Sequence, residues 1–259
     1  MTVLEQTRDG RGVVTLTLNR PQIGNRLSGE LIAALTGAAE TLAQDCTVRV
    51  IVLTGAGAAF CAGGDPDWMQ AQIDGDAVSR RQAAHGLATL LQTLNNLPKA
   101  LIGRVNGPAI GSGVGLLAVC DAAIGVEHAT FGLTETRLGL IPATIGPYVV
   151  GRIGVTYARR YLLASRLFDA PVALAMGLLA RVVPEAGLGG AVEAEVAPWL
   201  DCAPGAVAEA KSLVRRLAGV PDEALIAETI ERLVKRWESA EATEGIAALQ
   251  QNRKPSWAL

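Results

Sequence analysis

The sequence predicts an α/β fold, because short β-rich runs alternate with helical patterns along most of the chain. After about residue 204 the strand pattern stops, and the apolar residues follow helical spacing to the end. The chain has 259 residues, enough to bury a full core. We therefore expect a compact α/β body over residues 1–200 and a wholly helical region over 201–259.

The predicted strands are runs rich in β-branched and aliphatic residues, at 13–18, 48–54, 100–105, 122–126 and 181–183. Ser28 is a typical N-cap for a first helix, in which Leu31, Leu35 and Leu42 lie near one face. Leucines at 87, 90, 91, 94 and 97 indicate a second helix. In the C-terminal region, residues 225–237 show the same spacing, and such an apolar face must pack on the body or on another subunit, so an oligomer is expected.

Composition and charge exclude several classes of protein. The formal net charge is −2, which provides no general attraction for nucleic acid or an anionic membrane. The most apolar stretch, residues 107–120, is too short to span a bilayer and contains Pro108 and Ser112. Residues 1–10 are polar and acidic where a secretory signal would be basic and then apolar. We expect a cytoplasmic protein with no nucleic-acid or membrane partner.

Cysteine and histidine usage argues against a metal site. The four cysteines, at 46, 61, 120 and 202, form no C-x-x-C pair, so buried reduced thiols are expected rather than a zinc site or disulfides. Only His85 and His128 are present and no H-E-x-x-H motif occurs, so no metal is expected. His85 falls in a helical pattern and His128 in a turn, where solvation or a local hydrogen bond is the usual role.

Two glycine-rich turns follow two of the predicted strands. The first strand and turn, residues 50–65, read Val-Ile-Val-Leu-Thr-Gly-Ala-Gly-Ala-Ala-Phe-Cys-Ala-Gly-Gly-Asp, and the second, residues 104–116, read Arg-Val-Asn-Gly-Pro-Ala-Ile-Gly-Ser-Gly-Val-Gly-Leu. Glycine lets backbone N–H groups approach a ligand, and a helix that begins at residues 111–113 would add its own free N–H groups. The turns predict a two-donor oxyanion hole, although tight strand-to-helix connections would look the same.

Other ligand motifs fit poorly. Gly55 and Gly57 match the start of a dinucleotide fingerprint, but Phe60 stands at the third glycine position. The sequence has no G-x-x-x-x-G-K-[ST] motif, and Ser112 does not lie in G-x-S-x-G. Neither a Rossmann site, a P-loop nor a hydrolase triad is expected.

Several motifs, in order and over nearly the whole chain, resemble the crotonase superfamily, the enoyl-CoA hydratase/isomerase family. These are Asn-Arg-Pro-Gln-Ile-Gly-Asn-Arg-Leu-Ser at 19–28, Phe-Cys-Ala-Gly-Gly-Asp at 60–65, Asn-Gly-Pro-Ala-Ile-Gly-Ser-Gly-Val-Gly-Leu at 106–116, Phe-Gly-Leu-Thr-Glu at 131–135, Gly-Leu-Ile-Pro at 139–142 and the closing segment 244–255. Asp-Trp-Met at 67–69 and the segment 136–144 look closest to a branch of methylglutaconyl-CoA and isohexenylglutaconyl-CoA hydratases.

The resemblance implies a spiral of ββα turns whose C-terminal helices mediate trimerisation, giving a homotrimer or a hexamer of two trimers. It also implies acyl-CoA thioester substrates, with coenzyme A as part of the substrate and no separate cofactor. The activity expected is that of an enoyl-CoA hydratase, a lyase that adds water across the 2,3 double bond, acting on a branched or glutaconyl-type substrate. A Δ3,Δ2-enoyl-CoA isomerase with a single glutamate and a non-catalytic acyl-CoA-binding protein remain alternatives.

Carried over by position, the resemblance assigns the oxyanion-hole donors to the N–H groups of Ala62 and Ser112, and acid/base chemistry to Glu135. The implied substrate and coenzyme A site includes the following residues: Arg26, Ala62, Gly63, Gly64, Asp65, Pro66 and Gly111. Trp68 and Met69 are candidates for the acyl pocket, with core packing as the alternative.

Two positions depart from the family pattern. Gly115 stands where typical hydratases carry a first glutamate. Asn252 stands where some relatives contribute a basic residue from a neighbouring subunit, and Arg253 or Lys254 is a candidate substitute.

Overall fold

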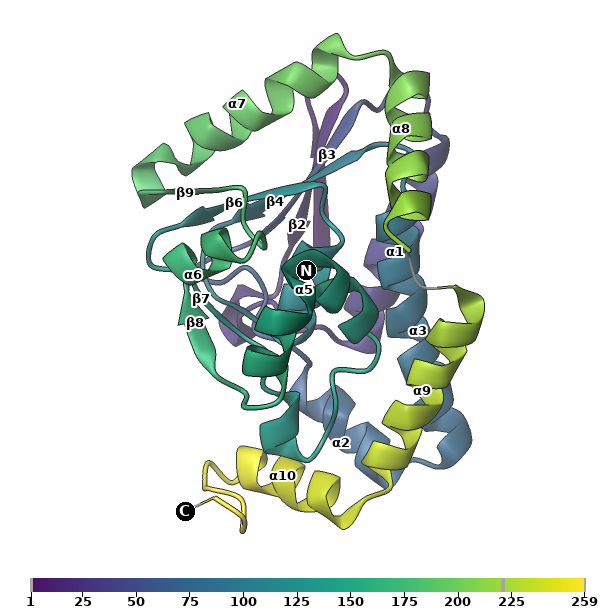
Figure 1. Cartoon of the computed structure of the whole chain (residues 1–259), viewed down its shortest axis with the longest axis vertical. Coiled ribbons are helices and arrows are strands. Elements are labelled where there is room, and N and C mark those ends of the chain that lie inside the picture. The colour runs from purple at the N-terminus through teal and green to yellow at the C-terminus, as the bar shows by residue number, and fades with distance from the viewer. Residues whose placement is uncertain (1, 220–221, 259) are drawn as a thin grey trace.

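The computed structural model describes residues 2–219 and 222–258 and shows a twisted sheet flanked by helices (Figure 1). The main sheet has the strand order β1-β2-β3-β4-β6-β9, and every neighbouring pair is parallel except β1 with β2. These strands are β1 (Leu4–Arg8), β2 (Val13–Leu18), β3 (Val50–Gly55), β4 (Ala100–Val105), β6 (Ala122–Val126) and β9 (Arg181–Val183). A smaller sheet joins β5 (Ala109–Ile110), β7 (Thr130–Gly132) and β8 (Leu167–Asp169).

The helices cover the sheets and extend beyond them. They are α1 (Gly29–Gln44), α2 (Pro66–Asp74), α3 (Ala77–Asn96), α4 (Ser112–Ala118), α5 (Gly146–Leu162), α6 (Ala170–Ala175), α7 (Leu188–Asp201), α8 (Pro204–Leu217), α9 (Glu223–Trp237) and α10 (Ala240–Gln250), with short 3-10 turns η1 (Pro21–Ile23), η2 (Glu135–Leu138) and η3 (Glu185–Gly187). Helix α1 packs on α3, and α7 packs on β3, β4 and β6. In the described residues no helix is long and apolar enough to span a membrane.

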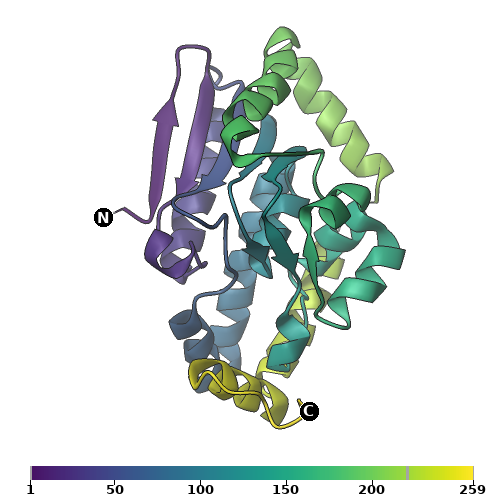
Figure 2. The same cartoon turned by 90° about the vertical axis from the view of Figure 1, so that its left-hand side faces the viewer.

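The structure confirms the five predicted strands, with β3 shifted to begin at Val50. Helix α1 begins as predicted, because the Ser28 side chain accepts a hydrogen bond from the N–H of Leu31. Strand β1 was missed because its residues are mostly exposed and polar, as an edge strand allows. Figure 2 shows the β1–β2 hairpin at one edge of the molecule.

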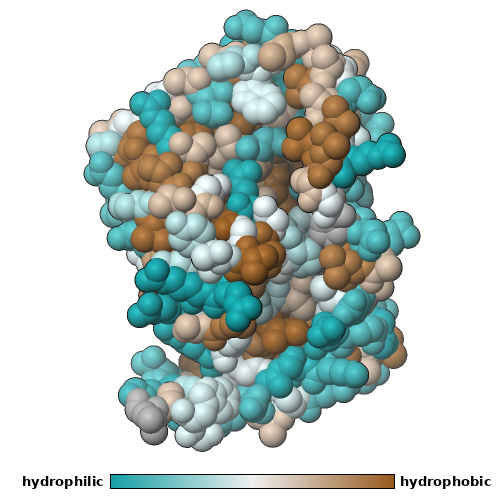
Figure 3. Space-filling model, in the orientation of Figure 1, coloured by the Kyte–Doolittle hydropathy of each residue, from teal (hydrophilic) through white to brown (hydrophobic). Residues whose placement is uncertain are grey.

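The C-terminal region is helical as predicted, but its helices differ in how they pack. Helices α9 and α10 form a second apolar cluster with α2, α3 and the segment after η2, through residues that include Ile230, Leu233, Trp237 and Ile246. Helix α8 buries none of its residues. Leu213, Val214 and Leu217 of α8 are exposed, and Figure 3 shows an apolar patch over this helix.

The expectation of four buried thiols is half wrong. Cys61 and Cys120 are buried, and burial raises the pKa of each thiol to about 12. Cys46 and Cys202 are exposed, because they lie next to the ends of α1 and α7, where the chain turns at the surface.

Candidate active site

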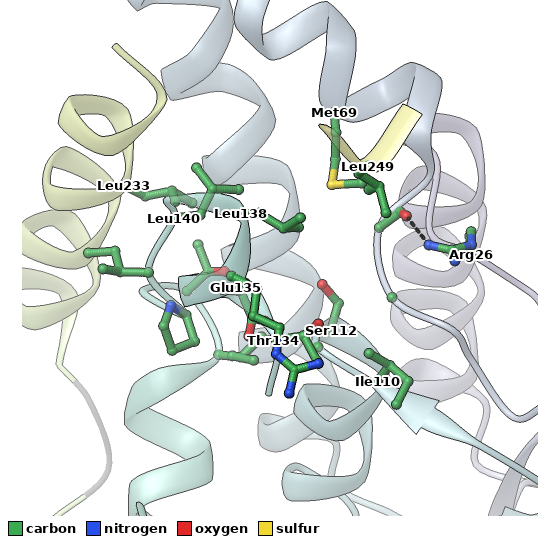
Figure 4. Close-up of a pocket in the computed structure, with 18 of the residues that line it drawn as sticks. Arg26, Met69, Ile110, Ser112, Thr134, Glu135, Leu138, Leu140, Leu233 and Leu249 are labelled. Carbon is green, nitrogen blue, oxygen red and sulfur yellow. Dashed lines mark hydrogen bonds between the residues drawn. The ribbon is translucent and has the colours of Figure 1, made fainter. Parts of the chain in front are cut away.

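A cavity of about 340 Å³ opens where the two glycine-rich turns meet η2 and the C-terminal helices. Figure 4 shows Glu135 at its centre, Leu138, Leu140 and Leu233 on one side, and Ser112 and Ile110 on the other. The cavity is lined by Arg26, Ala62, Gly63, Gly64, Trp68, Met69, Ile110, Gly111, Ser112, Thr134, Glu135, Arg137, Leu138, Leu140, Ile141, Pro142, Thr144, Ile145, Leu233, Trp237 and Leu249. Segments far apart in the sequence therefore share one pocket.

The two turns are locked together by backbone hydrogen bonds. The N–H of Ile110 donates to the carbonyl of Cys61 at 2.9 Å, and the N–H of Cys61 donates to the carbonyl of Pro108 at 3.1 Å. A Cβ on Gly113 would lie only 2.3 Å from the Cys61 carbonyl oxygen, so a side chain there would force the turns apart. The glycines are needed for this close approach.

The structure corrects one of the two predicted oxyanion-hole donors. The N–H of Ala62 donates to the carbonyl of Gly24 at 2.8 Å and is not free to bind a ligand. Two residues further on, the N–H of Gly64 has no hydrogen-bond partner among residues 2–219 and 222–258. The N–H of Ser112 is likewise unpaired within that part of the chain, because Ser112 is the first residue of α4 and has no acceptor in the helix. Gly64 and Ser112 thus each carry an unpaired N–H, and both residues line the cavity.

Glu135 begins η2 directly beside the second turn. A Cβ built on Gly111 would lie 3.0 Å from Glu135 Oε1 and 4.0 Å from the Cα of Gly63, which shows how tightly the three residues meet. Gly111 has φ of 52°, a conformation that favours glycine. The carboxylate therefore lies against the turn that carries the Ser112 donor.

Burial makes Glu135 a proton-transfer group suited to neutral pH. The residue as a whole is half-buried, but its Oε2 atom is fully buried and has no hydrogen-bond partner in the described residues. Loss of solvation raises the pKa of this carboxyl to about 7, with a small opposing effect from its own backbone N–H. A carboxyl with this pKa is both a usable acid and a usable base.

The space next to Gly115 is filled by an apolar side chain. A Cβ on Gly115 would lie 2.5 Å from Cγ2 of Ile145, and Leu91 is the next nearest side chain. Ile145 is 1% exposed and lines the cavity. A second carboxylate is absent at this position, and the packing leaves no room for one.

Most of the residues predicted for the coenzyme A site line the cavity, but two do not. Arg26 lies at the rim, where its Nη1 donates to the Gly64 carbonyl at 3.2 Å (Figure 4). Asp65 instead caps α2 through the N–H groups of Asp67 and Trp68 and pairs with Arg20 at 2.8 Å. Pro66 is the first residue of α2, behind the lining. Asp65 and Pro66 therefore lie outside the cavity lining, and their contact with coenzyme A stays a prediction.

Comparison with known proteins identifies the family. The family model for enoyl-CoA hydratase/isomerase matches residues 8–258. The chain belongs to the enoyl-CoA hydratase/isomerase family. Enoyl-CoA hydratase AKT6-1 of Alternaria alternata is 34% identical over 245 residues, which cover 94% of this chain and 80% of that protein.

Solved structures confirm the fold. An enoyl-CoA hydratase from Shewanella pealeana is 33% identical with a TM-score of 0.81, covering 98% of this chain and 96% of its own. AtuE of Pseudomonas aeruginosa is 36% identical with a TM-score of 0.81, covering 99% of this chain and 100% of its own. The crotonase-type fold and an enzyme of the hydratase/isomerase family are thus established, whereas the methylglutaconyl-type branch stays a prediction.

The sequence pattern did not predict the part of the cavity wall that distant segments of the chain form. Leu233 and Trp237 of α9 line the cavity, although their spacing indicated only an apolar helix face, and Leu249 of α10, which was not singled out, lines it as well. Arg137 also lines it and was not singled out, although it lies two residues after Glu135 in the motif.

The remaining candidates lie outside the lining. His85 is on α3 with Thr89 Oγ1 at 3.1 Å from its Nδ1, and His128 is exposed in a turn. Arg253 pairs with Glu244 at 2.6 Å, so it is already engaged within its own chain. Asn252 lies outside the lining as well, and a contact from a neighbouring subunit stays a prediction.

Proposed function

We propose that this protein is an enoyl-CoA hydratase-type lyase that adds water across the 2,3 double bond of an enoyl-CoA. The observation that carries the proposal is one buried carboxyl, Glu135, with a pKa of about 7, in the same cavity as two unpaired backbone N–H groups. The names of the relatives support the same activity.

The geometry supports a mechanism with a backbone oxyanion hole. The thioester oxygen accepts hydrogen bonds from the N–H groups of Gly64 and Ser112, which stabilise the negative charge that forms there when oxygen adds to Cβ. One such donor typically contributes about 10²- to 10³-fold in rate. A binding site with both donors therefore favours the enolate over the ground-state thioester.

Glu135 completes the reaction by moving one proton. As a carboxylate it takes a proton from water while the resulting hydroxide oxygen bonds to Cβ, and the carbon–carbon double bond shifts its electrons toward the thioester oxygen. The enolate then collapses, and Cα takes the proton from the carboxyl, which regenerates the carboxylate. All atoms of one water molecule end in the product, and the same acid/base group carries out both proton transfers.

A second candidate is a Δ3,Δ2-enoyl-CoA isomerase, favoured by the packing of Ile145 against Gly115. A 1,3-proton shift removes a proton from C2 of a 3-enoyl thioester and returns it at C4, which a single carboxylate does without water. The apolar wall at Ile145 suits this reaction.

Labelled water distinguishes these candidates. Incubation of the protein with crotonyl-CoA in ¹⁸O-water should place ¹⁸O at Cβ of the product, read by mass spectrometry. A 3-enoyl-CoA converted to its 2-enoyl isomer, with no ¹⁸O uptake by either compound, would instead establish the isomerase. Binding of both esters without any product or any proton exchange at Cα in D₂O would support the non-catalytic acyl-CoA-binding alternative.

We also infer a homotrimer or a hexamer of two trimers. The exposed apolar residues Leu213, Val214 and Leu217 on α8 support association, because isolated chains rarely leave such a helix face in water. Light scattering of the purified protein should give a mass three or six times that of the chain, and a monomer would contradict the inference.

A further inference from the structure

One of the two unpaired donors, the N–H of Gly64, belongs to the loop between β3 and α2 and to no helix or longer strand. Both neighbours of Gly64 are bound to Leu27. The N–H of Leu27 donates to the Gly63 carbonyl at 2.8 Å, and the N–H of Asp65 donates to the Leu27 carbonyl at 3.0 Å. These two bonds form a single parallel bridge, which holds the loop but occupies neither polar group of Gly64 itself.

The Arg20 side chain makes a second link between the same two segments. Its Nη1 donates to the Arg26 carbonyl at 2.8 Å, and its Nη2 pairs with Oδ2 of Asp65 at 2.8 Å. Arg26 precedes Leu27 in the chain. Asp65 follows Gly64, so the guanidinium joins the two residues that adjoin the bridge. A guanidinium presents its donors in a rigid planar fork, and the two contacts therefore restrain both segments at once.

The backbone of Arg20 is itself fixed by Asn25. The N–H of Arg20 donates to Oδ1 of Asn25 at 2.9 Å, and the carbonyl of Arg20 accepts from the N–H of Asn25 at 2.9 Å. Asn25 is fully buried, and its Nδ2 donates to the carbonyls of Ala56 and Ala59 at 2.8 Å each. The Arg20 side chain thus starts from a point that is tied to the first glycine-rich turn, the turn that leads to Gly64.

The two carboxylate oxygens of Asp65 have separate partners. Oδ1 accepts from the N–H groups of Asp67 and Trp68 and caps α2, whereas Oδ2 pairs with Arg20. The side chains of Arg20 and Asp65 are only 19% and 6% exposed. Water therefore replaces a lost partner poorly at this site, and removal of either side chain leaves the other without its counter-charge.

We propose that Arg20 is a positioning residue that holds the Gly64 N–H where the thioester oxygen accepts it. The guanidinium does so by tying the Arg26 carbonyl to the Asp65 carboxylate across the bridge. Arg20 lies outside the cavity lining, so it acts through the loop rather than on the substrate. The inference rests on the proposed function for the position of the thioester. A fixed donor stabilises developing charge, and a looser loop therefore weakens the enolate more than the bound thioester.

Two substitutions break the pair from opposite sides. Arg20→Gln removes the charge and the fork, whereas Asp65→Asn keeps Oδ1 as the cap of α2 and replaces the second oxygen with an amide donor. Each should lower kcat for crotonyl-CoA by about 10- to 100-fold and change KM by less than about 3-fold, as expected for a misplaced donor. The double variant should be no slower than the slower single one, because both changes remove the same link. Arg20→Lys should recover part of the rate, since the charge returns without the fork.

A ligand that ionises when it binds tests the donor without turnover. Acetoacetyl-CoA loses a Cα proton to form an enolate, which has its own ultraviolet absorption band and is favoured by an oxyanion hole. The wild type should raise the ratio of enolate to ketone above that in solution at the same pH. At saturating ligand, Arg20→Gln should lower this ratio by about 10-fold or more. Butyryl-CoA forms no such enolate and should bind both proteins with equal affinity in isothermal titration.

The matched control is Arg49→Gln. Arg49 is half-buried, as Arg20 is, and lies outside the cavity lining. Its Nη2 also joins distant segments, with hydrogen bonds to the Leu200 and Cys202 carbonyls at 3.0 and 2.7 Å. This variant should leave kcat and the enolate ratio as in the wild type. If Arg20→Gln alters them no more than Arg49→Gln does, or weakens butyryl-CoA and acetoacetyl-CoA by the same factor, the positioning role is overturned.

Failure of this inference and failure of the proposed reaction give different results. A wild type that forms the enolate without hydrating any enoyl-CoA, together with loss of the enolate in Arg20→Gln, would support the role of Arg20 and contradict the hydratase. Normal hydration in Arg20→Gln would contradict the role of Arg20 alone. A wild type that binds acetoacetyl-CoA only as the ketone would show that Gly64 is no oxyanion donor, which also overturns the positioning role.

Discussion

The two walls of the cavity are built in different ways. One wall is backbone and carboxyl: the turns that carry Gly64 and Ser112, with Glu135 against them. The other is apolar side chains, some of them from the C-terminal helices, such as Leu233 and Leu249. The first wall has almost no freedom to vary, because main-chain atoms meet at contact distance. The second is set by side chains that can be exchanged one at a time.

The difference between the two walls indicates which residues govern turnover and which govern substrate selectivity. Donors on a rigid backbone need no reorganisation during the reaction, which is what stabilisation of a developing charge requires. Side chains on α9 and α10 can change the shape of the acyl site without moving these donors. We therefore expect changes on the backbone wall to affect turnover and changes on the apolar wall to affect substrate binding.

The largest effect is expected from Glu135→Gln, which keeps the shape of the side chain and removes its proton-transfer chemistry. Because an acid/base group is worth about 10²- to 10⁴-fold, kcat should fall by that factor. Hydration kinetics measure the loss, and unchanged circular dichroism confirms folding. Unaltered turnover would show that Glu135 is not the acid/base group.

Gly111→Ala tests the rigidity of the backbone wall. Its new Cβ would lie 3.0 Å from Glu135 Oε1 at a backbone φ of 52°, so the turn or the carboxyl must shift. We expect kcat to fall by about 10- to 100-fold from misplacement alone, and the free energy of unfolding to fall by about 1–2 kcal/mol.

A control glycine lies in the interior of α1. A Cβ on Gly37 meets nothing within 4 Å, so Gly37→Ala should raise the free energy of unfolding by roughly 0.5–1 kcal/mol and leave kcat as it is. Denaturant titration and steady-state kinetics provide both readouts. If both alanine variants behave alike, the backbone wall is more tolerant than its contacts indicate.

The pKa of Glu135 predicts how stability changes with pH. The native pKa of about 7 exceeds the ordinary 4.5, so the folded protein holds this proton where the unfolded chain has released it. The stabilisation that Glu135 gives through this proton is therefore complete below pH 4.5 and is lost as the pH rises to 7. The free energy of unfolding falls by roughly 3 kcal/mol at most.

Denaturant titrations of the wild type and Glu135→Gln between pH 5 and 8 measure this effect. The wild type should lose stability relative to the variant as the pH rises through that window. A difference between the two proteins that is independent of pH would mean that Glu135 is solvated like an ordinary surface carboxyl.

The smallest effect is expected on the apolar wall, from Leu249→Ala. Leu249 lines the cavity and is 39% exposed, so its truncation removes little core packing. Loss of apolar contact with the acyl group should raise KM about 2- to 5-fold with kcat nearly constant. Leu174→Ala, with 43% exposure on α6 and outside the lining, is the control. A fall in kcat without a change in KM would contradict the division between the walls.

Much of the framework could be predicted from local signals. Strand β6 was found because a run of small and aliphatic residues with no polar break indicates a strand buried on both faces, and β4 has the same character apart from Arg104. The start of α1 at Ser28 followed from capping chemistry. The edge strand β1 had no such signal, since four of its five residues are exposed.

The sequence by itself determined the α/β order, the glycine turns at the strand ends and, through the resemblance, Glu135 as the candidate acid/base group. Only the tertiary structure decided which N–H groups are open: the carbonyl of Gly24, 38 residues before Ala62 in the chain, accepts the hydrogen bond of the Ala62 N–H, whereas the Gly64 N–H has no partner in the described residues. It also decided that Ile145 fills the space beside Gly115 and that burial raises the pKa of Glu135. Periodicity and capping depend on neighbours along the chain, whereas competition for a donor, the filling of space and the loss of solvation depend on groups that only folding brings together.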